Sequence, residues 1–158
     1  MSTRSEGQPS GEQATGSFEW SSTPGYIKAD TITASWDKDA WVIYALHGNA
    51  SQRGYQQFHF RLPAKSESEP IKHQYVSDVP VKDDTPVREP GMVYFYVWNK
   101  PTQYGDYEIV SVTMGGFIKL AFNPLSNTFE GSFRYISPRA SSHDLEGDGT
   151  FRFFLPKP

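Results

Sequence analysis

The segment Met92-Val93-Tyr94-Phe95-Tyr96-Val97-Trp98 is apolar or aromatic at every position. Successive side chains of a β-strand point to opposite faces, so this segment predicts a strand with two different apolar faces. One face would carry Val93, Phe95 and Val97. The other face would carry Tyr94, Tyr96 and Trp98. We expect the first face to fill the core, which leaves the aromatic face to be covered by a second layer, to line a pocket or to meet solvent.

Segments on both sides of this strand alternate between apolar and polar residues. The clearest alternation is in 55–62, where the side chains expected to face the core are Phe58, Phe60 and Leu62. Those expected to face outwards are Gln57, His59 and Arg61. The other expected strands are 17–20 (alternatively an aromatic plug), 26–36, 41–46, 72–76, 107–114, 117–122, 128–136 and 150–155. Segment 41–46 could also be a short helix capped by Asp37 or Asp39, but its run Val42-Ile43-Tyr44 favours a strand.

The last third of the chain has the pattern of an antiparallel meander. Turn residues at 115–116 and 123–127 separate three of its expected strands. About eight to ten short strands at regular spacing are typical of a β-sandwich or β-barrel. The sequence therefore predicts an all-β fold, a single antiparallel sandwich or barrel, and does not choose between these two forms.

Two polar segments mark the boundaries of this domain. Residues 1–16 are rich in Ser, Gly, Gln and Glu, so we expect them to form a disordered leader before a single β domain at 17–158. Residues 77–90 contain three prolines among charged residues and predict a long irregular loop.

Composition excludes several classes of protein. The net charge of −3, from 15 basic and 18 acidic residues, does not fit a nucleic-acid-binding protein. The chain has no cysteine, which excludes disulfides, thiol catalysis and cysteine-ligated metals. No secretory signal and no apolar run long enough to span a membrane is visible. We therefore expect a soluble protein, cytoplasmic by default, with non-classical export as the alternative.

Several motifs in the chain are shared with a known group of domains. They are Thr31-Ile32-Thr33-Ala34, Gly116-Phe117-Ile118-Lys119-Leu120-Ala121-Phe122, Phe129-Glu130-Gly131-Ser132-Phe133 and Gly149-Thr150-Phe151. In this order the chain resembles small, uncharacterised bacterial all-β domains, often lipoproteins, that end in G-x-F hairpin strands. The resemblance implies the all-β fold and no activity, and the absence of a lipidation cysteine argues against anchoring by a lipid.

The candidate binding residues come from two of the expected strands. The first set is the aromatic face, whose rings and polar hydrogens could stack on a sugar or line a pocket: Tyr94, Tyr96 and Trp98. The second set is His59 and Arg61, which lie two residues apart on one strand face and could bind an anion. The plainer interpretations are a strand buried on both faces for the first set and a solvated face for the second.

No motif of catalysis or metal binding stands out. The four histidines, at 47, 59, 73 and 143, have no close metal-ligand spacing. Residues 144–149 resemble the first half of a calcium loop, but position twelve of that loop would be Leu155 instead of an acid. We therefore assign no catalytic residue, no metal and no cofactor, and an acidic turn is the plainer interpretation of 144–149.

These observations favour non-enzymatic binding of a small apolar or sugar-like ligand, such as a metabolite or glycan, in an aromatic-lined pocket or groove. The alternative is a protein-interaction or self-assembling module, a structural subunit or a secreted effector, that uses a sheet edge or the loop 77–90. A hydrolase or isomerase is the third class, because acid and base residues from distant strands leave no local motif.

Overall fold

The computed structural model describes residues 12–21, 25–49, 51–77, 89–113, 115–136 and 146–156. Within these ranges it describes only the backbone of residues 12, 73, 77, 89–101 and 107–113. The described chain contains strands and no helix, which confirms the all-β fold class. The strands are β1 (Glu12–Gln13), β2 (Thr15–Ser21), β3 (Tyr26–Lys28), β4 (Thr31–Asp37), β5 (Ala40–His47), β6 (Gln56–Pro63), β7 (Ile71–Ser77), β8 (Glu89–Pro101), β9 (Tyr107–Thr113), β10 (Gly115–Asn123), β11 (Thr128–Ile136) and β12 (Glu146–Phe154).

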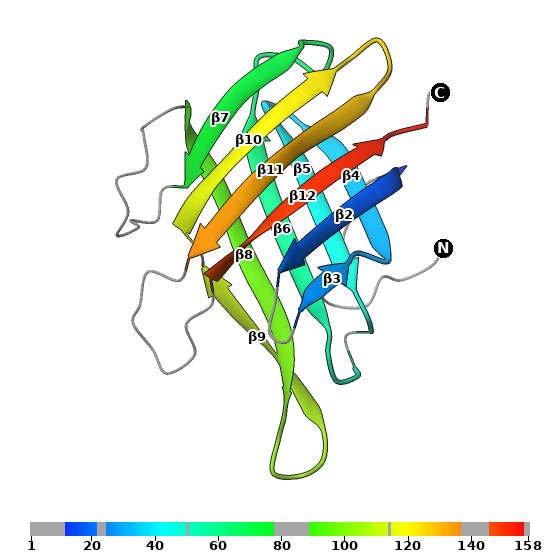
Figure 1. Cartoon of the computed structure of the whole chain (residues 1–158), viewed down its shortest axis with the longest axis vertical. Helices are drawn as coiled ribbons and strands as arrows, with labels where there is room; N and C mark the ends of the chain where they lie inside the picture. The colour runs from blue at the N-terminus through cyan, green and yellow to red at the C-terminus, as the bar shows by residue number, and fades with distance from the viewer. Residues whose placement is uncertain are drawn as a thin grey trace.

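The strands form two antiparallel sheets that face each other (Figure 1). The front sheet has the order β7-β10-β11-β12-β2-β3, and the back sheet has the order β1-β4-β5-β6-β8, with β9 also paired to β8. One short parallel pairing joins the sheets, where Tyr75 and Ser77 of β7 lie opposite Glu89 and Met92 of β8. The architecture is that of a sandwich, and the parallel pairing is the one departure, within the described ranges, from the expected antiparallel pattern.

Aromatic side chains fill the space between the two sheets. The ring of Phe18 in β2 stacks on Phe151 in β12 at 5.3 Å, and it also meets Phe60 of the back sheet at 5.9 Å. Phe58 meets Phe133 across the same space at 5.3 Å. Aromatic pairs at such distances add stability to the burial of their apolar surface. Packing between β6 and the front sheet therefore holds the sandwich together.

The predicted core face of 55–62 is confirmed. Phe58, Phe60 and Leu62 are fully buried, with at most 1% of each residue exposed. The segment 41–46 lies in a strand, β5, and not in a helix. The segment 26–36 is not one strand: it divides into β3, at the edge of the front sheet, and β4 in the back sheet. The chain crosses between sheets here, and the amide of Ala29 donates a hydrogen bond to Phe18 of the front sheet.

The ordered chain begins earlier than expected. Residues 12–16, which we assigned to a disordered leader, contribute β1 and the start of β2. Glu12 pairs with Ala34, and the buried Ala14 donates its amide hydrogen to the carbonyl oxygen of Ile32. Backbone pairing with β4 therefore orders a segment whose side chains are mostly polar. Residues 1–11 lie outside the described residues.

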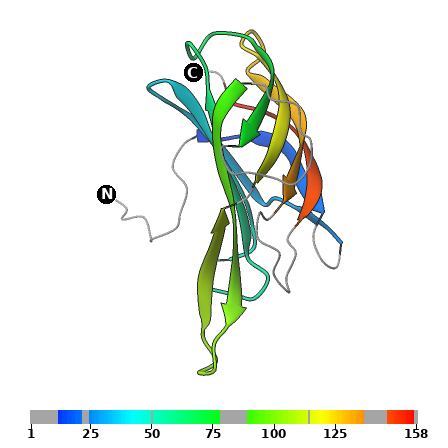
Figure 2. The ribbon, with the colours of Figure 1, turned by 90° about the vertical axis from the view of Figure 1, so that its left-hand side faces the viewer.

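The hairpin of β8 and β9 extends beyond the ends of the other strands (Figures 1 and 2). At its tip the side chain of Tyr104 is 81% exposed. No helix in the described ranges is long and apolar enough to cross a membrane.

Candidate functional site

The aromatic segment 92–98 lies in β8, as its sequence predicted. The backbone register places Tyr94 opposite Phe60 and Tyr96 opposite Phe58 of β6. Residues directly opposite each other in an antiparallel pair share a face of the sheet. The register thus assigns positions 94 and 96 to the core side of the back sheet, where we had expected positions 93, 95 and 97.

The side chains of Tyr94, Tyr96 and Trp98 lie outside the described residues. Trp98 has the register position opposite Gln56, which is buried. A pocket lined by this aromatic face therefore stays a prediction.

His59 is not a solvated cation. Its ring stacks on Tyr44 of β5, with 4.4 Å between the ring centres and 2° between the ring planes. Burial of the ring, with a smaller contribution from the neighbouring charge of Arg61, lowers the pKa of His59 from 6.5 to about 4. His59 is therefore neutral at pH 7.

Arg61 is held by two carboxylates of the turn between β4 and β5. Its guanidinium donates to Asp37 Oδ2 at 3.1 Å and to Asp39 Oδ1 at 2.7 Å. An anionic ligand would have to compete with both carboxylates, and the neutral His59 would give it no charge. The pair His59 and Arg61 is therefore close in space, as predicted, but poorly suited to bind an anion.

The outward face of β6, which carries Gln57, His59 and Arg61, is less exposed to solvent than we predicted. Gln57, which we expected to face solvent, is buried and accepts a 2.6 Å hydrogen bond from the hydroxyl of the buried Tyr55. The ring of Tyr44, which stacks on His59, covers one face of that histidine. This face of β6 is thus a partly buried polar layer and not a solvated surface.

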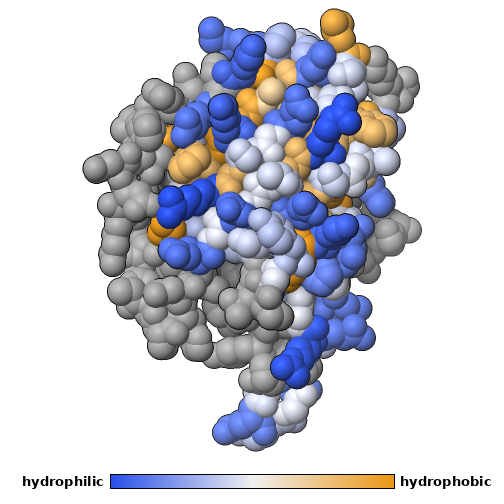
Figure 3. Space-filling model, in the orientation of Figure 1, coloured by the Kyte–Doolittle hydropathy of each residue, from blue (hydrophilic) through white to orange (hydrophobic). Residues whose placement is uncertain are grey.

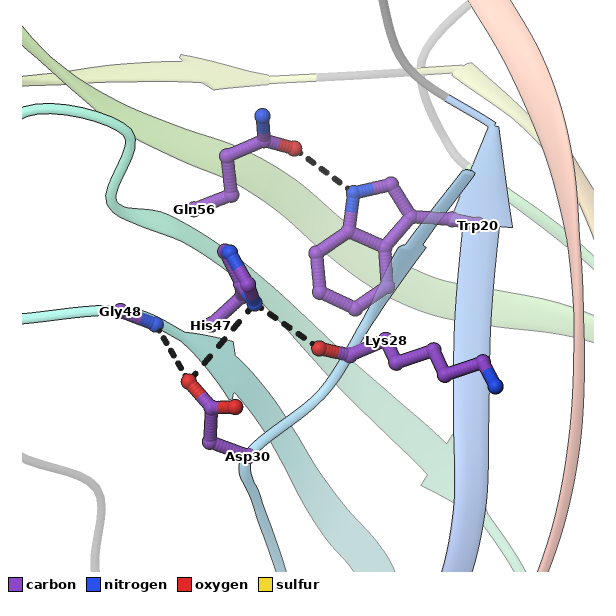
Figure 4. A network of polar contacts seen from close by, with 6 residues as sticks. All are labelled: Trp20, Lys28, Asp30, His47, Gly48 and Gln56. Atoms are coloured by element: carbon purple, nitrogen blue, oxygen red, sulfur yellow. Dashed lines mark hydrogen bonds and ion pairs between the residues drawn. The ribbon is translucent and has the colours of Figure 1, made fainter. Parts of the chain in front are cut away.

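A second polar cluster joins β2 to β6, and the connection between β3 and β4 to the end of β5 (Figure 4). The indole of Trp20 donates to Gln56 Oε1 at 2.7 Å inside the core. Outside it, Asp30 accepts from the amide of Gly48 at 2.7 Å and lies 3.6 Å from Nδ1 of His47. These contacts fix the connections between strands, so we interpret the cluster as structural.

The outer face of the front sheet carries two adjoining hollows, with volumes of about 490 and 350 Å³. We call them together the outer groove. The larger hollow is lined by Pro70, Ile71, Lys72, Ala121, Phe122, Asn123, Pro124, Leu125, Ser126, Thr128, Glu130 and Arg152. The smaller hollow is lined by Lys72, Gln74, Lys119, Leu120, Ala121, Glu130, Gly131 and Ser132. On this face hydrophilic side chains are interrupted by paler, less polar ones (Figure 3).

The outer groove exists because one small residue lies between long ones. Ala121 of β10 lies between Lys72 of β7 and Glu130 of β11 in one row across the sheet. The row continues to Arg152 of β12, which pairs with Glu130 in the ladder and lies 3.6 Å from its carboxylate, and then to Ser17 of β2. The methyl group of Ala121 cannot fill the space between these longer side chains, so the sheet surface is hollowed there.

Metal binding gains no support from the described side chains. No group of three histidine, aspartate or glutamate side chains in the described ranges could hold a metal ion. Glu146–Gly149, the described part of the segment that resembles a calcium loop, is not a turn but the start of β12 and pairs with β11. An extended, paired strand cannot wrap around an ion. The side chain of His73 and all of His143 lie outside the described residues.

Comparisons with models of protein families, with curated proteins and with solved structures return no match. The outer groove therefore has to be interpreted from its own geometry.

Proposed function

We propose that this protein is a non-enzymatic binding protein whose small ligand lies in the outer groove. The observation that carries the proposal is the pair of hollows around Ala121, whose volumes fall in the range of about 300–1,000 Å³ typical of small-molecule sites. The space between the sheets around Phe58 and Phe133 is occupied by aromatic rings. A ligand on the outer face needs no rearrangement of that core.

Ala121→Trp tests the proposal, because the new indole would fill the centre of the outer groove. Lys28→Trp is the control: Lys28 is an exposed residue of β3, at the edge of the front sheet, and neither it nor its cross-strand partner Glu19 lines the groove. A library of metabolites and glycans is screened by the shift in melting temperature that a bound ligand causes. We expect a hit to keep its shift in Lys28→Trp and to lose it in Ala121→Trp.

The same screen tests the aromatic pocket that the sequence predicted. If Trp98→Ala folds and loses the ligand shift while Ala121→Trp keeps it, the site lies at β8 and the outer groove is the wrong location. If the ligand shift survives in both Ala121→Trp and Trp98→Ala, neither location is correct.

One observation favours a second candidate, a protein-interaction module. The β8–β9 hairpin projects from the sandwich, and Tyr104 at its tip is 81% exposed (Figure 2). Exposed aromatic residues are enriched at protein interfaces. This candidate predicts a mass that rises with concentration in light scattering and returns to the monomer value in Tyr104→Ala. The other predicted contact, the loop 77–90, lies for the most part outside the described residues.

A further inference from the structure

We infer that the outer groove selects a small anionic amphiphile, with its carboxylate or phosphate between Lys72 and Lys119 and its apolar body directed towards Leu125. The inference rests on the proposed function, because it names the ligand class for the same groove. Three features of the groove lead to it: the placement of its charges, the apolar residues at one end and the small side chain of Ala121 between them.

The first feature is charge. The outer groove has three cationic side chains, Lys72, Lys119 and Arg152, and one anionic side chain, Glu130, which gives a local charge of +2. The whole chain has a net charge of −3. A cationic groove on an acidic protein favours an anionic ligand over a neutral or cationic one.

The two lysines are the cations left for a ligand. Arg152 lies 3.6 Å from the carboxylate of Glu130, which partly neutralises it. Among the described residues neither Lys72 nor Lys119 has an acidic partner, and both are exposed. An anion that enters the groove would therefore displace no existing ion pair from them.

The register brings the two lysines within reach of one group. Lys72 lies opposite Ala121, and Lys119 precedes Ala121 by two positions on the same strand. Such diagonal neighbours are roughly 7–8 Å apart, a distance that two flexible lysine side chains can bridge around one carboxylate or phosphate. Gln74 and Ser132 flank Lys119 in its row and could donate further hydrogen bonds.

The second feature is the apolar end of the groove. Pro70 and Pro124 line the larger hollow beside Leu125, whose side chain is 81% exposed. The turn that carries Leu125 is fixed by a 2.9 Å hydrogen bond from its amide to Asn123 Oδ1. A fixed, exposed leucine in a hollow that two prolines also line gives an apolar ligand body a surface to cover.

The third feature is the floor that joins the two ends. Ala121 lines both hollows, and its methyl group is too small to separate them. Lys72 also lines both hollows, so the cationic end and the apolar end are continuous. One elongated molecule could therefore contact both ends at once.

Isothermal titration calorimetry tests the inference, with dodecanoate and dodecyl phosphate below their micelle concentrations and dodecanol below its solubility limit. The test variant is Lys72→Gln/Lys119→Gln. The control variant is Lys28→Gln/Lys65→Gln, which removes the same charge from exposed residues outside the groove. Circular dichroism confirms that both variants fold.

We expect dodecanoate or dodecyl phosphate to bind at least tenfold more tightly than dodecanol. The test variant should weaken this binding at least tenfold, and the control variant should change it less than twofold. Equal affinity for dodecanol, equal effects of the two variants or no binding of either anion would overturn the inference. The proposed function has a separate test. It fails if the melting-temperature shift caused by a screening hit survives in Ala121→Trp. If a neutral hit loses its shift in Ala121→Trp, the proposed function stands.

Discussion

Gly131→Ala should destabilise the protein, because the front sheet leaves no room for a side chain at this position. A Cβ atom built on Gly131 would lie 2.1 Å from the carbonyl oxygen of Lys119 and 3.1 Å from the Cα atom of Leu120. Real Cβ atoms do not come within 3.0 Å of such atoms. These are backbone atoms of β10, so the clash cannot be relieved by rotating a side chain. The β10–β11 ladder would have to shift.

The size of the effect follows from two opposing contributions. Overpacking a well-packed site costs about 1–3 kcal/mol. Replacing glycine by alanine also restricts the unfolded chain, which offsets roughly 0.4–1 kcal/mol. The net loss of unfolding free energy should be about 1–2 kcal/mol, which corresponds to a fall in melting temperature of roughly 2–8 °C for a domain of this size.

Urea unfolding and differential scanning calorimetry measure this loss, with Gly25→Ala as the control. A Cβ atom on Gly25 would meet no atom within 4 Å, so this variant should stay within about 0.5 kcal/mol of the wild type. If Gly131→Ala is as stable as Gly25→Ala, the close approach of β10 and β11 described above is wrong.

Three further variants test other parts of the structure. Phe58→Ala should lower the unfolding free energy by about 3–5 kcal/mol in urea titrations, because it opens a cavity at the centre of the core; a loss below 1 kcal/mol would contradict this packing. The pKa of His59 is lower in the folded protein than in the unfolded chain, so between pH 6.5 and about 4 the unfolded chain binds more protons than the folded protein. The unfolding free energy should therefore fall by at most about 3 kcal/mol as the pH falls through this range. Urea titrations at pH 7 and 4.5 should show a smaller fall for His59→Gln than for the wild type, and an equal fall would refute the burial of a neutral ring. Arg61→Met should cost less than about 1 kcal/mol, because its partners Asp37 and Asp39 are exposed; a larger loss in thermal unfolding would mean that the pairs are stronger than their exposure suggests.

The strands themselves could be predicted from the sequence, because their signal is local. The alternation in 55–62 correctly gave Phe58, Phe60 and Leu62 as core residues, and the β-branched run in 41–46 correctly gave a strand. The ends of the domain were less well predicted. β1 contains only Glu12 and Gln13, and it is ordered by pairing with β4, which no composition rule shows.

The order of the strands could not be predicted in the same way. β2 pairs with β12, and β7 pairs with β10, although these partners are far apart in the chain. The outer groove depends on this order, since Lys72 and Lys119 become neighbours only when β7 lies beside β10. In the sequence Lys72 and Lys119 are two isolated lysines, so nothing local marks them as a pair.

The candidate site at His59 shows a different limit. The sequence correctly placed His59 beside Arg61 on one strand face, but the chemistry of the pair depends on other strands. Tyr44 of β5 covers His59, and the turn after β4 supplies the carboxylates that hold Arg61. For the same reason the faces of β8 could be separated by alternation but not assigned to the core or to the surface, because that assignment depends on the register with β6.

The most direct test of the binding site is to map it on the protein. Amide chemical shifts of the ¹⁵N-labelled protein are recorded while dodecanoate is added. Binding in the outer groove predicts that the largest shift changes fall in 71–74 of β7, in 119–125 of β10 and the turn after it, and in 130–132 of β11. Shift changes concentrated in 56–60 and 94–98, on β6 and β8, would contradict it and place the ligand at the aromatic strand instead.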